Sequence, residues 1–95
     1  MFDQLISTST GAAVASGVLT TTDANTTGLA ITRGLQVRGG TLPKGTYIAS
    51  AAGTGSGTHL WNLANDSNAA IPDNGSFDLT VIAVDGGARL PLTAI

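Results

Sequence analysis

His59 and Trp61 are the residues of this chain whose types and spacing come closest to a chemical site. If residues 58–63 form a strand, side chains two positions apart point to the same face, so the imidazole and the indole lie side by side. A catalytic histidine also needs a nucleophile and an orienting acid, and Ser56 does not stand in the G-x-S-x-G motif that marks one such nucleophile. We therefore predict a packing or surface role for His59, and no enzymatic activity.

A polar segment further along the chain carries several oxygen ligands of the kind that calcium prefers. These residues are Asn65, Asp66, Asn68, Asp73 and Asn74. Their order does not fit the EF-hand rule, because Ala70 occupies the third ligand position after Asp66 and Ile71 the position of the required glycine. The segment is predicted to be a loop of solvated turn residues, with no metal site.

The glycine-rich run at residues 53–57 does not match a phosphate-binding loop. It lacks both the G-x-x-x-x-G-K-S/T and the G-x-G-x-x-G spacing, and no helical pattern follows it. A flexible hairpin connection is the simpler interpretation. The chain has no cysteine, which excludes disulfides and thiolate ligands, and we predict no cofactor.

The charge balance argues against nucleic acid as a partner, because four Lys and Arg face six Asp, for a net charge of -2. No apolar stretch has the length of a membrane span, and no basic segment precedes the first apolar residues, so neither a membrane partner nor a signal peptide is expected. Arg33 and Arg38 are possible partner contacts if a bulge at Gly34 places them on one face. Otherwise they are solvated strand charges.

Abundant Thr and Gly and the absence of Glu indicate an all-β protein. Short alternating or apolar segments separated by turn signals predict about five strands, in a small β-sandwich or barrel. The segments are residues 29–38, 46–49, 58–63, 76–84 and 88–94, the last confined to an edge or a bulge by Pro91. They form one predicted domain, residues 29–95.

Residues 1–28 are rich in Thr, Ser, Ala and Gly, which suggests an extended N-terminal arm; a weak first strand is the alternative. The large apolar residues are few for a chain of 95 residues, so we expect a thin core. Association with further copies or with a larger assembly is the expected source of additional stability.

The segment Leu42-Pro43-Lys44-Gly45-Thr46 predicts a type II turn over residues 42–45, leading into a strand. This turn resembles the Leu-Pro-x-Gly-Thr turn that lambda-like head decoration proteins, the capsid cement of tailed bacteriophages, commonly carry before an apolar strand. The similarity extends loosely over residues 39–93. The turn is its specific part.

The resemblance implies a structural virion protein on the outer capsid surface, made in the host cytoplasm, that stabilises the shell by bridging coat subunits. The major capsid protein would be its partner, and the chain would form homotrimers. Residues 1–22 would be the capsid-binding arm, with Phe2, Leu5 and Ile6 as apolar anchors.

Two other functions remain open. A tail, spike or baseplate module that binds a host surface would show Trp61 and Tyr47 exposed in a groove, because aromatic platforms bind sugars. A small enzyme or a metal-dependent binder is the other alternative.

Overall fold

Seven strands account for most of the computed structural model, which describes residues 3–84. They are β1 (Asp3–Ala15), β2 (Val18–Thr22), β3 (Thr26–Gly28), β4 (Gln36–Arg38), β5 (Thr46–Gly55), β6 (Thr58–Asn65) and β7 (Asn74–Val84). A single 3-10 turn, η1 (Asp23–Asn25), joins β2 to β3 and is the one helical element in this part of the chain. The predicted all-β class is confirmed.

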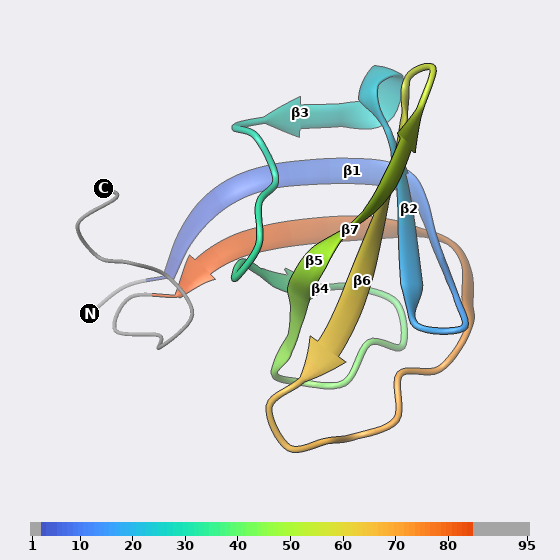
Figure 1. The fold of residues 1–95 in the computed structure, drawn as a ribbon. Helices are drawn as coiled ribbons and strands as arrows, with labels where there is room; N and C mark the ends of the chain where they lie inside the picture. The colour runs from blue at the N-terminus through green and yellow to red at the C-terminus, as the bar shows by residue number, and fades with distance from the viewer. Residues whose placement is uncertain (1–2, 85–95) are drawn as a thin grey trace.

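Six of the strands close into an antiparallel barrel in the order β1-β2-β6-β5-β4-β7, and β7 returns to β1 (Figure 1). Of the two predicted architectures, the barrel is the one adopted. The remaining strand, β3, pairs with β1 alongside the barrel. Closure leaves each of the six strands with a neighbour on both sides, which removes the exposed edges of an open sheet.

β1 organises one end of this barrel because two strands share one of its edges. Its first half pairs with β3 at Ser7–Ser9, and its second half pairs with β2 at Ala13–Ala15. β7 runs along the other edge, from the pair Asp3–Val84 to the pair Val14–Asn74. Beyond its pairs with β1, β2 continues along β6, so a fork opens between β2 and β3.

Residues 3–28, which lie in the segment predicted as an extended arm or a weak first strand, contribute β1, β2 and β3. Together with the four predicted strands that lie within residues 3–84, these three make the seven strands of the described chain. The alternation in β1 is carried by small residues, because Ser7, Ser9, Ala12 and Val14 are its buried positions. Two hydroxyls at buried positions give no hydrophobic signal, which explains why the pattern predicts β1 poorly.

The core lies inside the barrel, and its most deeply buried large side chains come from β2, β4, β5 and β7. Leu19, Val37, Ile48, Leu79 and Val81 are each 1% exposed or less. Trp61, Leu63 and Phe77 pack against them from positions that are partly open to solvent. A few large residues surrounded by small ones make the thin core that the composition predicts.

The observed strands β4 to β7 differ from the predicted segments mainly in where they begin and end. Only residues 36–38 of the segment 29–38 are strand, because the chain turns at Arg33 and Gly34, where Gly34 has φ +94°. β5 continues to Gly55 through the run predicted to be flexible, and the hairpin turn is Ser56-Gly57. β6 and β7 contain the predicted segments 58–63 and 76–84. The predicted strand 88–94 lies outside the described residues.

A membrane-spanning helix, which would need to be long and apolar, does not occur in residues 3–84.

Candidate functional site

A pocket of about 260 Å³ lies at the fork between β2 and β3, at one end of the barrel. β2, η1, β3, β6 and the segment 28–31 all contribute to its walls. The lining includes Thr21, Asp23, Thr26, Leu29, His59 and Trp61. Barrel mouths are frequent binding sites in proteins, because strands hold the side chains around them in fixed positions.

The pairing of β2 with β6 explains why these side chains meet. Leu19 pairs with Trp61, and Thr21 pairs with His59. Directly paired residues of antiparallel strands point to the same face, as do residues two positions apart. Because Leu19 is fully buried in the barrel, the other three side chains also face inward, with Thr21 and His59 one step closer to the mouth.

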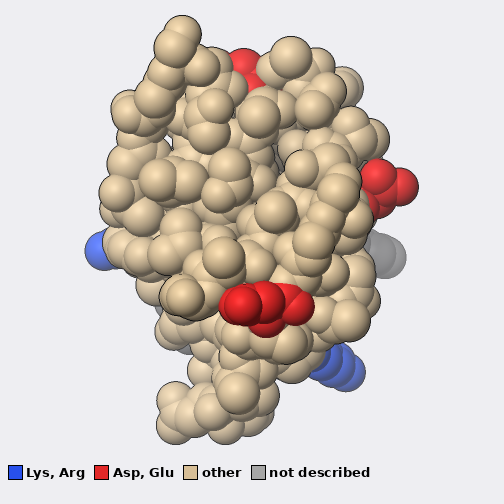
Figure 2. Space-filling model, turned by 90° about the vertical axis from the view of Figure 1, so that its right-hand side faces the viewer, with Lys and Arg blue, Asp and Glu red and all other residues tan. Residues whose placement is uncertain are grey.

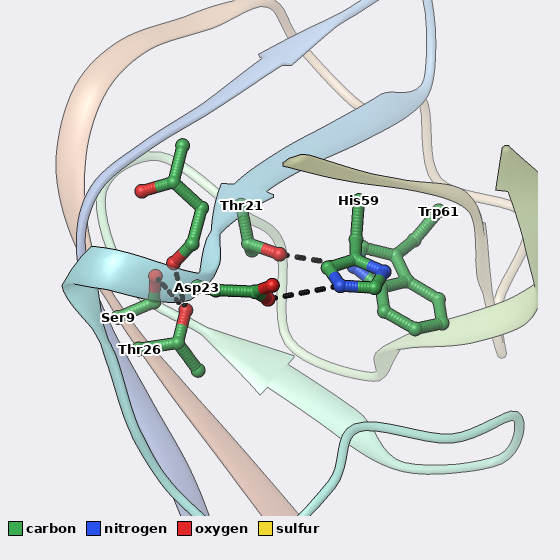
Figure 3. A network of polar contacts seen from close by, with 7 residues as sticks. Ser9, Thr21, Asp23, Thr26, His59 and Trp61 are labelled. Carbon is green, nitrogen blue, oxygen red and sulfur yellow. Dashed lines mark hydrogen bonds and ion pairs between the residues drawn. The ribbon is translucent and has the colours of Figure 1, made fainter. Parts of the chain in front are cut away.

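The two rings of the pocket are stacked, with their centroids 5.8 Å apart and an angle of 18° between their planes (Figure 3). The indole Nε1 of Trp61 donates a hydrogen bond to Thr21 Oγ1 at 3.2 Å, and His59 Nε2 lies 2.9 Å from Asp23 Oδ1. The expectation that His59 and Trp61 lie side by side is therefore confirmed. Each ring also has a polar partner that fixes its position.

Asp23 is the charged residue of this site that sequence reasoning missed. It is distant from His59 along the chain, and η1 brings it to the β5–β6 hairpin, where its backbone N–H donates to Gly57 O at 2.8 Å. The side chains of Asp23 and His59 are 64% and 35% exposed, so their contact lies at the rim of the pocket. The pairing of two distant strands created this contact, and no local motif could have indicated it.

Hydroxyl groups hold the β3 side of the pocket in place. Ser7 Oγ donates to Thr27 O at 2.8 Å, and Ser9 Oγ lies 2.9 Å from Thr26 Oγ1. Thr26 Oγ1 also donates to Thr22 O at 2.6 Å. These bonds, part of which Figure 3 shows, attach β3 and η1 to β1 and β2. The buried serines of β1 therefore serve to anchor the wall of the pocket.

The described part of the chain brings no three His or Asp side chains together as a metal centre would. In the polar loop after β6, Asp73 Oδ1 accepts a hydrogen bond from the backbone N–H of Ser16 at 2.9 Å. Asn65 Oδ1 accepts from the backbone N–H groups of Ser67 and Ala69, at 2.8 and 3.3 Å. Side chains of this loop thus satisfy the backbone, as turn residues do.

Comparisons of the chain with protein-family models, with curated proteins and with solved structures find no match. Function therefore has to be inferred from the pocket and from the other residues that the sequence singles out.

The two predicted capsid-binding residues that the structure describes lie in different environments. Leu5 is 60% exposed on β1, whereas Ile6 packs against the core. Phe2 lies outside the described residues. Leu29, which is 62% exposed, follows β3 directly, and its backbone N–H donates to Ile6 O at 2.7 Å. Leu5 and Leu29 thus lie on neighbouring segments, and we call them the leucine pair.

Arg33 and Arg38 are both exposed, Arg33 in the turn before β4 and Arg38 at its end. Arg38 Nη2 lies 3.4 Å from Gln36 Oε1. Figure 2 shows a face of the molecule on which charged side chains are few and Lys and Arg lie at the margins.

The family-like turn is formed one residue later than predicted. The backbone N–H of Thr46 donates to Pro43 O at 3.3 Å, and Gly45, with φ +88°, is the third residue of the turn. A positive φ at the third position is that of a type II turn, which here spans residues 43–46. Leu42 precedes the turn and packs against the core.

Asn65 holds this turn from the end of β6. Its Nδ2 donates to Lys44 O at 3.0 Å and to Thr46 Oγ1 at 3.2 Å, in addition to the two backbone bonds that its Oδ1 accepts. The residue is 7% exposed, so water cannot readily replace these partners. Asn65 therefore links the turn before β5 to the loop after β6.

We expect Asn65→Ala to lower the free energy of unfolding by about 2 kcal/mol, because it leaves partly buried groups without partners. Asn62→Ala is the matched control, since Asn62 is exposed and bonds Ser50 Oγ at the surface; its effect should stay within about 0.5 kcal/mol. Urea denaturation followed by circular dichroism measures both. Equal effects of the two variants would contradict the role of Asn65.

Proposed function

We propose that this chain is a structural virion protein that decorates the outer surface of a phage capsid and stabilises the shell by bridging coat subunits. The major capsid protein is its partner, the chain assembles as a homotrimer, and it has no catalytic role. The resemblance of residues 42–46 to the turn of lambda-like decoration proteins suggests this function, and the leucine pair supports it.

The leucine pair supports the proposal because it consists of two exposed apolar side chains on neighbouring segments, Leu5 on β1 and Leu29 directly after β3. Leu5 and Leu29 are the large hydrophobic residues that the described chain leaves exposed. Apolar side chains that pack in a contact with a partner gain about 25 cal/mol per Å² of buried area, whereas in water they gain nothing. Leu5 stands in residues 1–22, the segment that the resemblance assigns to capsid binding, and Leu29 lies outside it.

The test uses capsids that lack the protein, to which the purified chain is added. We expect the unaltered chain to bind at a ratio near one copy per coat subunit, measured by quantitative mass spectrometry, and to raise the temperature at which particles break. The double variant Leu5→Asp/Leu29→Asp should bind at least tenfold more weakly, since it places carboxylates in an apolar contact.

Ala70→Asp is the control, because Ala70 is exposed in the loop after β6 and the change adds the same charged group away from the leucine pair. It should bind as the unaltered chain does. Failure of the unaltered chain to bind capsids, or equal binding by all variants, would overturn the proposal. Circular dichroism of each variant shows that the fold is retained.

A tail, spike or baseplate module that binds a host surface is the second candidate, and one observation favours it. Trp61 lines an open pocket together with His59, as expected of an aromatic binding surface. Tyr47 is half-buried on β5 and does not line that pocket. A few copies of the chain in each purified particle would favour this candidate over decoration of the whole shell.

A further inference from the structure

We propose that the pocket at the fork between β2 and β3 binds one uncharged pyranose ring of a glycan. Of the leucine pair that supports the capsid proposal, Leu29 borders this pocket and Leu5 does not line it. The inference does not depend on where the protein sits in a particle.

The pocket offers the two surfaces that a sugar ring requires. Trp61 and His59 supply an aromatic wall, and Ile31 adds an aliphatic one. A pyranose has a face of C–H groups that packs on such walls, while its hydroxyls project from the ring edge. Asp23, whose carboxylate lies at the rim, accepts hydrogen bonds from hydroxyls, and a bond to a charged acceptor is stronger than one to a neutral acceptor.

The polar side chains of the pocket lie at its mouth and along one side, where the hydroxyls of a bound sugar ring would contact them. Asp23 and His59 meet at 2.9 Å at the mouth, and Thr26 lines the side formed by β3. A carboxylate has two oxygens, and the contact with His59 engages Oδ1. A few polar groups around an apolar interior are typical of small-molecule sites.

Size and charge narrow the ligand class. A volume of about 260 Å³ is near the lower end of ligand pockets, which hold roughly 300 Å³ or more for drug-sized molecules, so a single ring fits better than a larger ligand. The described lining residues include neither Lys nor Arg, and Asp23 adds a negative charge. Phosphates and sugar acids are therefore disfavoured, and an uncharged sugar is the ligand that fits.

The site is also held rigid before any ligand arrives. Trp61 is fixed by Thr21, His59 by Asp23, and the β3 wall by the buried serines of β1. Rigid side chains lose little conformational entropy on binding. Weak single-ring affinity can then become useful when several copies bind one polysaccharide.

Trp61 is the single tryptophan of the chain, so its fluorescence reports directly on this pocket. The full chain is titrated with the methyl glycosides of glucose, galactose, mannose, rhamnose and N-acetylglucosamine, with glycerol as the control for polyol effects. We expect a saturable change for at least one sugar, with a Kd on the order of 1 mM. The corresponding oligosaccharide then tests whether the ring is bound within a glycan.

Two variants test the assignment of residues. Asp23→Asn and His59→Phe should each weaken binding at least fivefold, because the first removes the charged acceptor and the second keeps an aromatic wall but loses the polar edge. Asp78→Asn makes the same change of charge at an exposed position of β7 outside the pocket, and should bind as the unaltered chain does. Circular dichroism verifies the fold of each variant.

The inference is overturned if none of the five sugars gives a saturable signal. Binding that is unaffected by both pocket variants would also overturn it, as would stronger binding of glucuronate than of glucose. Capsid binding is measured separately with the leucine variants, so failure of one proposal is distinguishable from failure of the other.

Discussion

Leu79→Ala is expected to lower the free energy of unfolding by about 3 kcal/mol and the thermal midpoint by about 15 °C. Leu79 is 1% exposed and lies in the same core cluster as Val37, Ile48 and Val81. Truncation removes apolar contact and leaves a cavity that strands fixed by a closed barrel cannot fill by moving. In a chain of 95 residues this is a substantial share of the total stability, which is on the order of 5–14 kcal/mol.

Leu29→Ala provides the matched control, because it makes the same chemical change at a side chain that is 62% exposed. Its effect should stay below about 0.5 kcal/mol. Thermal and urea denaturation, followed by far-ultraviolet circular dichroism, measure both variants. Similar losses for the two leucines would mean that the barrel interior is not the source of stability.

Gly39→Ala should lower the free energy of unfolding about as much as Leu79→Ala does, by about 3 kcal/mol. Gly39 follows β4 with φ +139°, a conformation that residues with a Cβ rarely adopt. A Cβ there would overlap the backbone carbonyl oxygen of Asp78, on the strand with which β4 pairs, and would come within 3.1 Å of the Phe77 ring. The alanine therefore forces β4 away from β7.

Gly55→Ala is the corresponding control, because a Cβ at Gly55 meets no atom within 4 Å. It should leave stability unchanged or raise it slightly, since alanine restricts the unfolded chain more than glycine does. Denaturation curves compare the two, and amide exchange along β4 shows whether the loss is local. A neutral Gly39→Ala would mean that the chain after β4 relaxes freely.

The sequence predicts the strands whose buried positions are large and apolar. β7 alternates clearly around Leu79 and Val81, and the structure has a strand there. β1 is the longest strand, yet its buried positions include Ser7 and Ser9, whose hydroxyls bond β3. Such positions become interpretable only when the partner strand is known.

The alternation of residues along the sequence also stops predicting burial where the chain leaves a strand. Leu29 shares the parity of Leu35 and Val37, which are buried, but it is exposed because β3 ends at Gly28 and the chain turns again at Gly34. A run of alternating residues therefore indicates one face only while the extended conformation continues.

Of the contacts in the candidate site, the sequence predicts only the one between residues of the same strand. The spacing of His59 and Trp61 predicts that their rings lie together, because that contact depends on a single strand. Thr21 comes from β2 and Asp23 from η1, and their contacts with Trp61 and His59 depend on how β2 pairs with β6. Asn65 appears in the sequence as one polar loop residue among several, and its burial at the end of β6 makes it a structural residue.

The double pairing of β1 has a mechanical consequence. Its hydrogen bonds to β7, and to β3 and β2 on the opposite edge, run across the strand direction. A pull on the chain before residue 3, directed along the strand, would load these bonds in shear, so that many must break together. If the N-terminal residues are tethered to a swelling or vibrating shell, β1 would resist the pulling force through many hydrogen bonds at once, and these bonds would not break one after another.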